Sequence, residues 1–163
     1  MQTVRLEISP TPAHVRTARL VAVAVARQCG VAEALLDEIR LAVGEACSRA
    51  VGLHRLHSRT ELVLIEFTNG GRFGVAVRDS APPEATNVAA PDPLALLSAS
   101  AGEDLGRGGA GSGRLDEPTE AFSEEALAAG VGLALLAGLV DDVEVAVAED
   151  GKGSVVRMSW PIG

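Results

Sequence analysis

Hydrophobic and polar residues alternate over residues 3–9, at the period of a β-strand with one buried face. A Ser-Pro-Thr-Pro sequence then interrupts the pattern and places Thr11 as the N-cap of a helix, with Pro12 at the first helical position. Residues 20–26, which read Leu-Val-Ala-Val-Ala-Val-Ala, suit a strand by period alone. The cap, the alanine content and a row of apolar residues at helical spacing favour a helix, which we expect Gly30 to end.

A second helix is predicted over residues 33–53, where apolar residues recur at intervals of three and four. That stripe consists of Ile39, Val43, Ala46, Ala50 and Leu53. The neighbouring face of the same helix carries Glu38, Glu45, Arg49 and Gly52. Two strands are then predicted over residues 61–68 and 72–78, because an Asn-Gly-Gly sequence between them is typical of a tight hairpin turn.

The pattern changes between residues 79 and 123. Four prolines come first, and residues 102–113 then hold six glycines. Segments of that length without regular structure are uncommon in a small domain, and they are usually functional lids or disordered insertions. We therefore expect a glycine- and proline-rich loop over about residues 80–123, for which both interpretations stay open.

Regular patterns resume at residue 126. A Gly-Val-Gly sequence precedes an apolar stretch over residues 133–140, which predicts a buried helix. Alternating valines over residues 143–147 and an apolar run over residues 155–160 predict two final strands joined by a tight turn. The order of elements predicts an α+β two-layer sandwich, in which a mixed, mostly antiparallel sheet is covered on one face by about three helices.

Composition narrows the class of protein. The 163 residues suit one domain, taken as residues 1–163, and the net charge of −8 argues against nucleic-acid binding and against a polybasic membrane anchor. Three Phe, one Trp and no Tyr leave little material for stacking on bases. Two cysteines in apolar surroundings, and the absence of an apolar run of signal-peptide length near the start, lead us to expect a cytoplasmic protein.

Four features could form a ligand site, and each also has a simpler explanation. Glu45 and Arg49 have the i, i+4 spacing of a surface ion pair on a helix. Asp79 follows a strand and could be a turn residue that bonds its own backbone. The Gly-Val-Gly sequence of residues 130–132 could bind phosphate at a helix N-terminus or only allow tight packing. Ser154, at the start of the last strand, is uninformative alone.

Together these features resemble, in order and spacing, the ATP-binding fold shared by histidine kinases, type II topoisomerases and Hsp90-like chaperones. The resemblance is greatest to the small bacterial anti-sigma factors that also act as serine kinases. Their Glu-Ala-x-x-Asn-Ala helix corresponds to Glu-Ala-Cys-Ser-Arg-Ala at residues 45–50, and their Asp-x-Gly motif to residues 79–81. Their Gly-x-Gly-Leu-x-Leu and Gly-Thr-x-Val motifs correspond to residues 130–135 and 153–156. The resemblance extends over essentially the whole chain.

The resemblance implies a role for each matching residue. Asp79 would accept a hydrogen bond from the adenine amino group, and Ser154 would lie beside the adenine in place of a threonine. Gly130 and Gly132 would let backbone amides approach the phosphates of ATP or ADP. Leu133 completes the same motif. Glu45 would act as the general base that takes a proton from a serine of the partner.

Two departures from the family pattern bear on activity. Arg49 stands where the family has the asparagine that holds magnesium, and a guanidinium group cannot ligate a cation. It could neutralise phosphate directly, or pair with Glu45 and block the cavity. Ala81 replaces the glycine of the Asp-x-Gly motif, and two prolines follow it. These changes lead us to expect impaired catalysis, with doubtful magnesium binding.

The resulting hypothesis is an anti-sigma regulatory protein with a degenerate ATP site and weak or no kinase activity. It would bind a sigma factor, a small anti-anti-sigma partner with a STAS-type domain, or both, and the resemblance implies a homodimer. The alternative is an active ATP-dependent serine kinase that phosphorylates the anti-anti-sigma partner, with Glu45 as the base. A module that phosphorylates histidine is disfavoured, because no helix carrying a phospho-acceptor histidine precedes the predicted domain.

Overall fold

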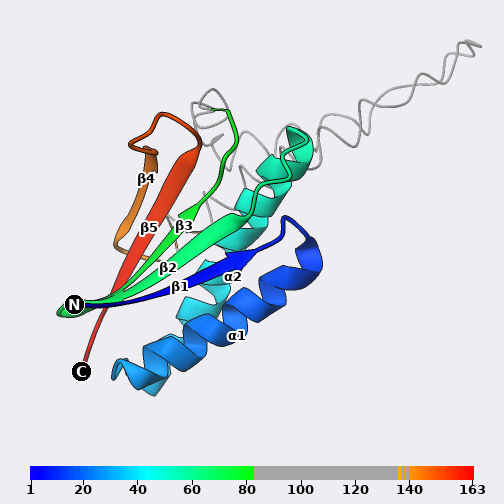
Figure 1. Ribbon diagram of the computed structural model, residues 1–163. Coiled ribbons are helices and arrows are strands. Elements are labelled where there is room, and N and C mark those ends of the chain that lie inside the picture. The colour runs from blue at the N-terminus through cyan, green and yellow to red at the C-terminus, as the bar shows by residue number, and fades with distance from the viewer. Residues whose placement is uncertain (83–135, 137, 139) are drawn as a thin grey trace, which may run out of the picture.

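The computed structural model describes residues 1–82, 136, 138 and 140–163. Within these residues the chain forms five strands and two helices (Figure 1). In chain order they are β1 (Gln2–Ile8), α1 (Pro12–Gln28), α2 (Glu33–Leu56), β2 (Val63–Asn69), β3 (Arg72–Arg78), β4 (Val143–Val147) and β5 (Ser154–Pro161).

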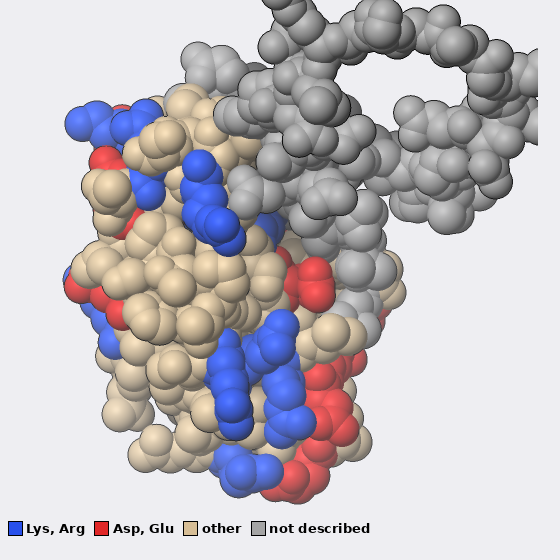
Figure 2. All heavy atoms as spheres, turned by 90° about the vertical axis from the view of Figure 1, so that its right-hand side faces the viewer, with Lys and Arg blue, Asp and Glu red and all other residues tan. Residues whose placement is uncertain are grey.

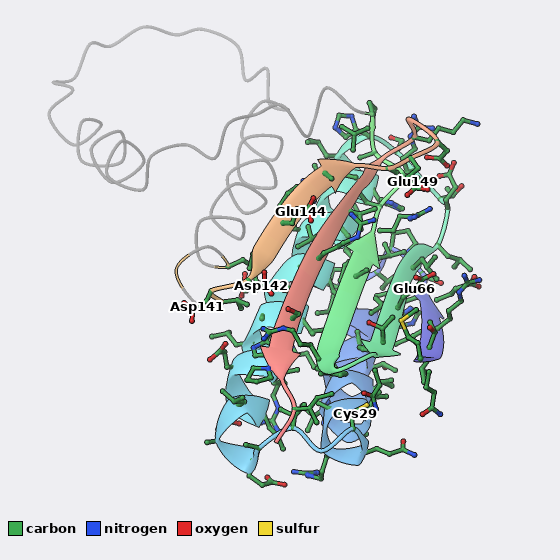
Figure 3. All side chains as sticks on the ribbon, turned by 90° about the vertical axis from the view of Figure 1, so that its left-hand side faces the viewer. Cys29, Glu66, Asp141, Asp142, Glu144 and Glu149 are labelled. Carbon is green, nitrogen blue, oxygen red and sulfur yellow. The ribbon has the colours of Figure 1, made fainter. Side chains whose placement is uncertain are left out.

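The strands form one sheet in the order β1-β2-β3-β5-β4, and the four pairings between neighbours are antiparallel. Helices α1 and α2 pack against each other and lie together on one face of this sheet (Figure 1). Figure 3 looks onto the other face, where no helix of the described residues lies in front of the strands. Glu66 of β2 and Glu144 of β4 are on this outer side.

The core lies between the sheet and the two helices. It takes the alternate residues of β2 and β3 that face the helices, namely Val63, Ile65, Phe67, Phe73, Val75 and Val77. The helices contribute the apolar stripe that the sequence predicts, including Ile39, Val43, Ala46 and Ala50. Phe73 lies between Phe67 and Trp160, with ring centroids 6.3 and 6.1 Å away. The aromatic residues within the described part of the chain therefore gather at one place in the core.

Helix α1 ends as the sequence predicts. Gly30 has a φ of +86°, a left-handed conformation that glycine adopts without steric cost. Its N–H donates to the carbonyl of Arg27 at 3.2 Å, and the next N–H, from Val31, donates to the carbonyl of Ala26 at 3.1 Å. These two bonds satisfy carbonyl groups at the end of the helix and turn the chain toward α2. At the other end, Thr11 is the N-cap residue but makes no side-chain cap bond.

The α+β class and the order of the described elements are confirmed. The strand predicted over residues 72–78 has those bounds, and α1 is a helix where period alone also allowed a strand. The number of helices differs slightly from the expected three or so, because the described residues include two helices with defined bounds, α1 and α2. Of the helix predicted over residues 133–140, the described residues Leu136 and Gly138 are helical. The loop predicted over about residues 80–123 lies outside the described residues from position 83 onward.

Neither described helix is both long enough and apolar enough to cross a membrane.

Candidate functional site

Three of the predicted site residues meet at one end of the sheet. Arg49 comes from the C-terminal half of α2, Asp79 directly follows β3, and Ser154 begins β5. Only 3% of Arg49, 2% of Asp79 and 0% of Ser154 is exposed to solvent. Burial of a charged side chain is costly unless it is paired. The charges and hydrogen-bonding groups of these three residues must therefore be paired within the protein.

The contacts among the three residues form a closed network. The Nη1 atom of Arg49 lies 3.4 Å from Oδ2 of Asp79 and 3.3 Å from Oγ of Ser154. The Ser154 hydroxyl group donates to the same carboxylate oxygen, Oδ2. The other oxygen, Oδ1, accepts the backbone N–H groups of Ala81 at 2.9 Å and of Ser154 at 3.3 Å. Both oxygens of the Asp79 carboxylate are thus already engaged within the protein.

The ends of β3 and β5 are held together at this point by the backbone. The Asp79 N–H donates to the carbonyl of Ser154 at 3.0 Å, which continues the β3–β5 pairing beyond Arg78 and Val155. Gly153, with a φ of +85°, lies so close that a Cβ atom there would be 1.8 Å from the carbonyl oxygen of Asp79. Only glycine allows this approach. The glycine of the predicted Gly-Ser-Val-Val motif therefore brings Ser154 against Asp79.

Burial and charge act in opposite directions on Arg49. Loss of water around the guanidinium group disfavours its charged form and lowers its pKa from the ordinary value. The negative charge of Asp79, and the hydrogen bond to it, raise the pKa of Arg49 and offset part of that effect. The ion pair is therefore what makes the buried arginine tolerable, and removing either partner would leave an uncompensated charge.

His54 supports the same corner of the fold, and the sequence analysis did not identify it as a site residue. Its side chain is fully buried, and Nε2 accepts the N–H of Ser80 at 2.8 Å. Because Nε2 is an acceptor, the ring proton is on Nδ1, which lies 3.0 Å from the carbonyl oxygen of Glu61 and donates to it. The neutral imidazole thereby fixes the turn after Asp79. One signal was present in the sequence: His54 continues the buried stripe of α2 four residues after Ala50.

Glu45 lies away from this network. It is half-buried and lines a groove of about 720 Å³ between α1 and α2, together with Arg16 and Arg19. Figure 2 faces the helices and shows Lys and Arg side chains on this side of the molecule. Arg49 forms its ion pair with Asp79, so the alternative in which Arg49 pairs with Glu45 along the helix is wrong. The reason is direction, because Arg49 points toward the sheet and Glu45 toward α1.

The remaining predicted residues divide into two groups. Ala81 is buried, packs against Leu53, and donates its N–H to Asp79, so it belongs to the site. The three predicted phosphate-motif residues lie outside the described residues, namely Gly130, Gly132 and Leu133. The structure thus brings together Arg49, Asp79, Ala81 and Ser154.

The comparison with known proteins is consistent with this arrangement. The family model described as histidine kinase-like ATPase domain matches residues 8–160. That range covers nearly the whole chain, and the chain therefore belongs to the histidine kinase-like ATPase family. Membership supports ATP or ADP as the ligand of this fold. A search of curated proteins gives no significant match.

Proposed function

Starting from membership of the histidine kinase-like ATPase family, we propose that this chain is a regulatory protein of the anti-sigma type with weak or no kinase activity. Its partners would be a sigma factor, a small anti-anti-sigma protein with a STAS-type domain, or both. The observation that carries the proposal is the buried network in which Arg49 contacts Asp79 and Ser154. Those are the two residues to which the family resemblance assigns adenine recognition.

The network competes directly with nucleotide. An adenine amino group would donate a hydrogen bond to the Asp79 carboxylate, but Oδ2 already accepts from Arg49 and Ser154, and Oδ1 from two backbone N–H groups. A nucleotide would therefore have to displace the guanidinium group, and the displaced charge would need a new partner in a buried environment. This cost lowers nucleotide affinity.

The residues do not fit a magnesium ion of the kind that the family resemblance implies. Arg49 occupies the position of the asparagine ligand, and its guanidinium group offers only donors and a positive charge. A divalent cation at this position would be repelled where it should be coordinated. The site therefore does not support Mg²⁺-dependent phosphoryl transfer. Protein binding is the function that the site leaves in place.

The charge of the chain supports a basic protein partner. The net charge is −8, so an acidic surface would attract a basic, DNA-binding sigma factor and speed its association. Such attraction weakens as salt screens the charges. The association rate constant of the partner should therefore fall when the ionic strength is raised.

The nucleotide half of the proposal is tested by isothermal titration of ATP and ADP, with and without Mg²⁺, into the native chain and into Arg49→Asn. We expect no measurable or only weak binding to the native chain, and a gain of at least about tenfold in affinity for Arg49→Asn, since the substitution frees Asp79. Arg40→Asn is the matched control, because Arg40 lies on the same helix with its side chain 51% exposed and pairs with Asp37 at the surface. Tight, Mg²⁺-dependent binding by the native chain would contradict the proposal and favour the alternative, an active serine kinase that uses Glu45 as its base.

The partner half is tested by affinity capture from the native host followed by mass spectrometry. We expect recovery of a sigma factor or of a small STAS-type protein, and binding of the purified partner in the absence of ATP. Recovery of neither class of protein would contradict the anti-sigma assignment even if the nucleotide result is as expected.

A further inference from the structure

The groove of about 720 Å³ between α1 and α2 has a positively charged lining. Arg16 and Arg19 line it from α1, and Arg55 lines it from α2. Glu45 contributes the one carboxylate among the described residues of the lining. Figure 2 faces this side of the molecule, where several Lys or Arg side chains lie on the surface. The groove is therefore locally positive, although the whole chain has a net charge of −8.

The two groove arginines of α1 lack the carboxylate partner that most other described arginines have. Six arginines lie 3.9 Å or less from a carboxylate oxygen, namely Arg5, Arg27, Arg40, Arg49, Arg59 and Arg72. Within the described part of the chain, Arg16 and Arg19 form no such pair, even though Glu45 lines the same groove. Carboxylates are not scarce in a chain with 22 acidic and 14 basic side chains. The positive charge of the groove is therefore left for a ligand.

A glycine of α2 determines where Arg19 lies. Gly44 is buried in the interior of this helix, where glycine is less favourable than alanine. A Cβ atom there would overlap Nε of Arg19 and would lie 2.9 Å from its Cζ and Nη2 atoms. The guanidinium group thus lies against the backbone of α2 because no side chain occupies that space. The position of Arg19 therefore accounts for a glycine that the helix alone would not favour.

The chemistry of the groove suits a phosphate group on a small molecule. A phosphate has several charged oxygens and can accept hydrogen bonds from more than one guanidinium group at once. Val15 and Val51 give the groove an apolar part, and Ser48 adds a hydroxyl group. Sites for small molecules usually have volumes of about 300–1,000 Å³, so the groove has room for more than the phosphate. Glu45 would repel phosphate but can accept a hydrogen bond from a hydroxyl or amino group elsewhere on the ligand.

We propose that the groove between α1 and α2 binds a small phosphorylated compound, with its phosphate on Arg16 and Arg19 and a hydroxyl or amino group near Glu45. The site is separate from the adenine site, because the described lining does not include Arg49 or Asp79. The bound phosphate would connect α1 to α2. The inference does not rest on the proposed function, because it uses neither the buried network nor a protein partner.

The test is isothermal titration of inorganic pyrophosphate, without Mg²⁺, into the native chain and four variants. Arg16→Gln and Arg19→Gln should each raise the dissociation constant about tenfold, since each removes a charge-assisted contact. Glu45→Gln should lower the dissociation constant about threefold, because it removes a carboxylate that repels phosphate. Arg27→Gln is the matched control: Arg27 is also on α1 but pairs with Glu33, so its loss should leave the dissociation constant unchanged.

A fifth variant, Gly44→Ala, separates binding from folding. Alanine favours the helix more than glycine does, but its methyl group must displace the guanidinium group of Arg19. The variant should therefore melt at the temperature of the native chain or above it, and bind pyrophosphate about fivefold more weakly. Native affinity in Gly44→Ala would contradict the placement of the phosphate on Arg19.

Absence of pyrophosphate binding by the native chain would overturn the proposal. Equal losses of affinity in Arg27→Gln and Arg16→Gln would also overturn it, because they would indicate only a general attraction of anions. Nitrogen magnetic resonance of the arginine Nε groups locates the anion directly. The signals of Arg16 and Arg19 should shift when pyrophosphate is added, and the signal of Arg49 should not. A shift confined to Arg49 would place the anion in the adenine site and contradict the proposal.

Discussion

The molecule contains two clusters of the same three residue types in different surroundings. In the buried cluster, Arg49 lies 3.4 Å from Asp79, and Ser154 donates to the same carboxylate. In the exposed cluster, Nη2 of Arg72 lies 3.5 Å from Oδ2 of Asp142, and Ser159 donates to that oxygen. The arginine also contacts the serine in both, at 3.3 Å and 3.0 Å. Asp142 is labelled on the outer side of the sheet in Figure 3.

The main difference between the two clusters is their exposure to solvent. The side chains of Arg49 and Asp79 are 3% and 2% exposed, whereas those of Arg72 and Asp142 are 52% and 66% exposed. Water and salt weaken the exposed pair, whose contribution to stability should be at most about 1 kcal/mol. Loss of one partner from a buried pair leaves an unpaired charge, which costs about 3–5 kcal/mol. Similar contacts among the same residue types therefore do not imply equal energy or equal function.

The largest effect is expected from removing the arginine of each cluster. Arg49→Ala should lower the free energy of unfolding by about 3–5 kcal/mol, whereas Arg72→Ala should lower it by less than about 1 kcal/mol. Urea unfolding followed by circular dichroism measures both. Similar losses for the two variants would show that burial does not distinguish the clusters.

The two cysteines extend the comparison to reactivity. Burial raises the pKa of the Cys47 thiol from 9.0 to about 12, although the charge of Arg19 lowers it slightly, whereas Cys29 is half-buried. A rise of three units keeps the thiol protonated at pH 8 and reduces its reactive thiolate about a thousandfold. A thiol reagent at pH 8 should therefore label Cys29 in the native protein and both cysteines in denaturant. Rapid labelling of Cys47 in the folded chain would contradict its closed environment.

Two glycines with similar backbones give a smaller contrast. Gly153 and Gly71 have φ values of +85° and +89°, but a Cβ atom at Gly153 would collide with Asp79, while one at Gly71 would meet nothing within 4 Å. Gly71→Ala should lower the free energy of unfolding by about 1–2 kcal/mol, because alanine must adopt the left-handed conformation. Gly153→Ala also forces the new methyl group against Asp79, so it should lower the free energy of unfolding by about 3 kcal/mol in total. Thermal unfolding of the two variants measures the difference, and equal costs would mean that the β3–β5 corner can relax.

The smallest effect concerns salt. Raising NaCl from about 0.1 M to about 1 M shortens the Debye length from about 10 Å to about 3 Å, which screens exposed charges far more than buried ones. Asp142→Asn should lower the free energy of unfolding by less than about 1 kcal/mol at low salt, and this difference from the native chain should disappear at high salt. Asp79→Asn should lower the free energy of unfolding at both salt concentrations. If both losses fade together, the Asp79 site is accessible to ions.

Local signals in the sequence were sufficient for most of the described fold. The alternation of apolar residues predicts the strand from Arg72 to Arg78, and Gly30 predicts the end of α1. Both features are determined by residues close together in the sequence. Helix α2 runs on to Leu56, beyond the predicted end at Leu53, since the buried His54 continues its apolar face. Such an extension is decided by tertiary packing, which a single stripe does not reveal.

The partner of Arg49 could not be predicted from spacing. Glu45 is four residues away and Asp79 thirty, so local rules favour the wrong carboxylate. The correct one is selected by the direction in which Arg49 leaves α2 and by the close approach of Gly153 to Asp79. The resemblance placed Arg49, Asp79 and Ser154 in one site, but it did not indicate that they would bond to one another.

The buried imidazole of His54 has a consequence for spectroscopy. Its two nitrogens have distinct environments, one protonated and donating to Glu61, the other accepting from Ser80. Nitrogen chemical shifts separate these two states, and a ring proton shielded from water exchanges slowly enough to be observed. The ring is therefore an intrinsic magnetic resonance probe of the turn after Asp79. Its signals would shift whenever that turn moves, and they would record the motion without any label being added to the protein.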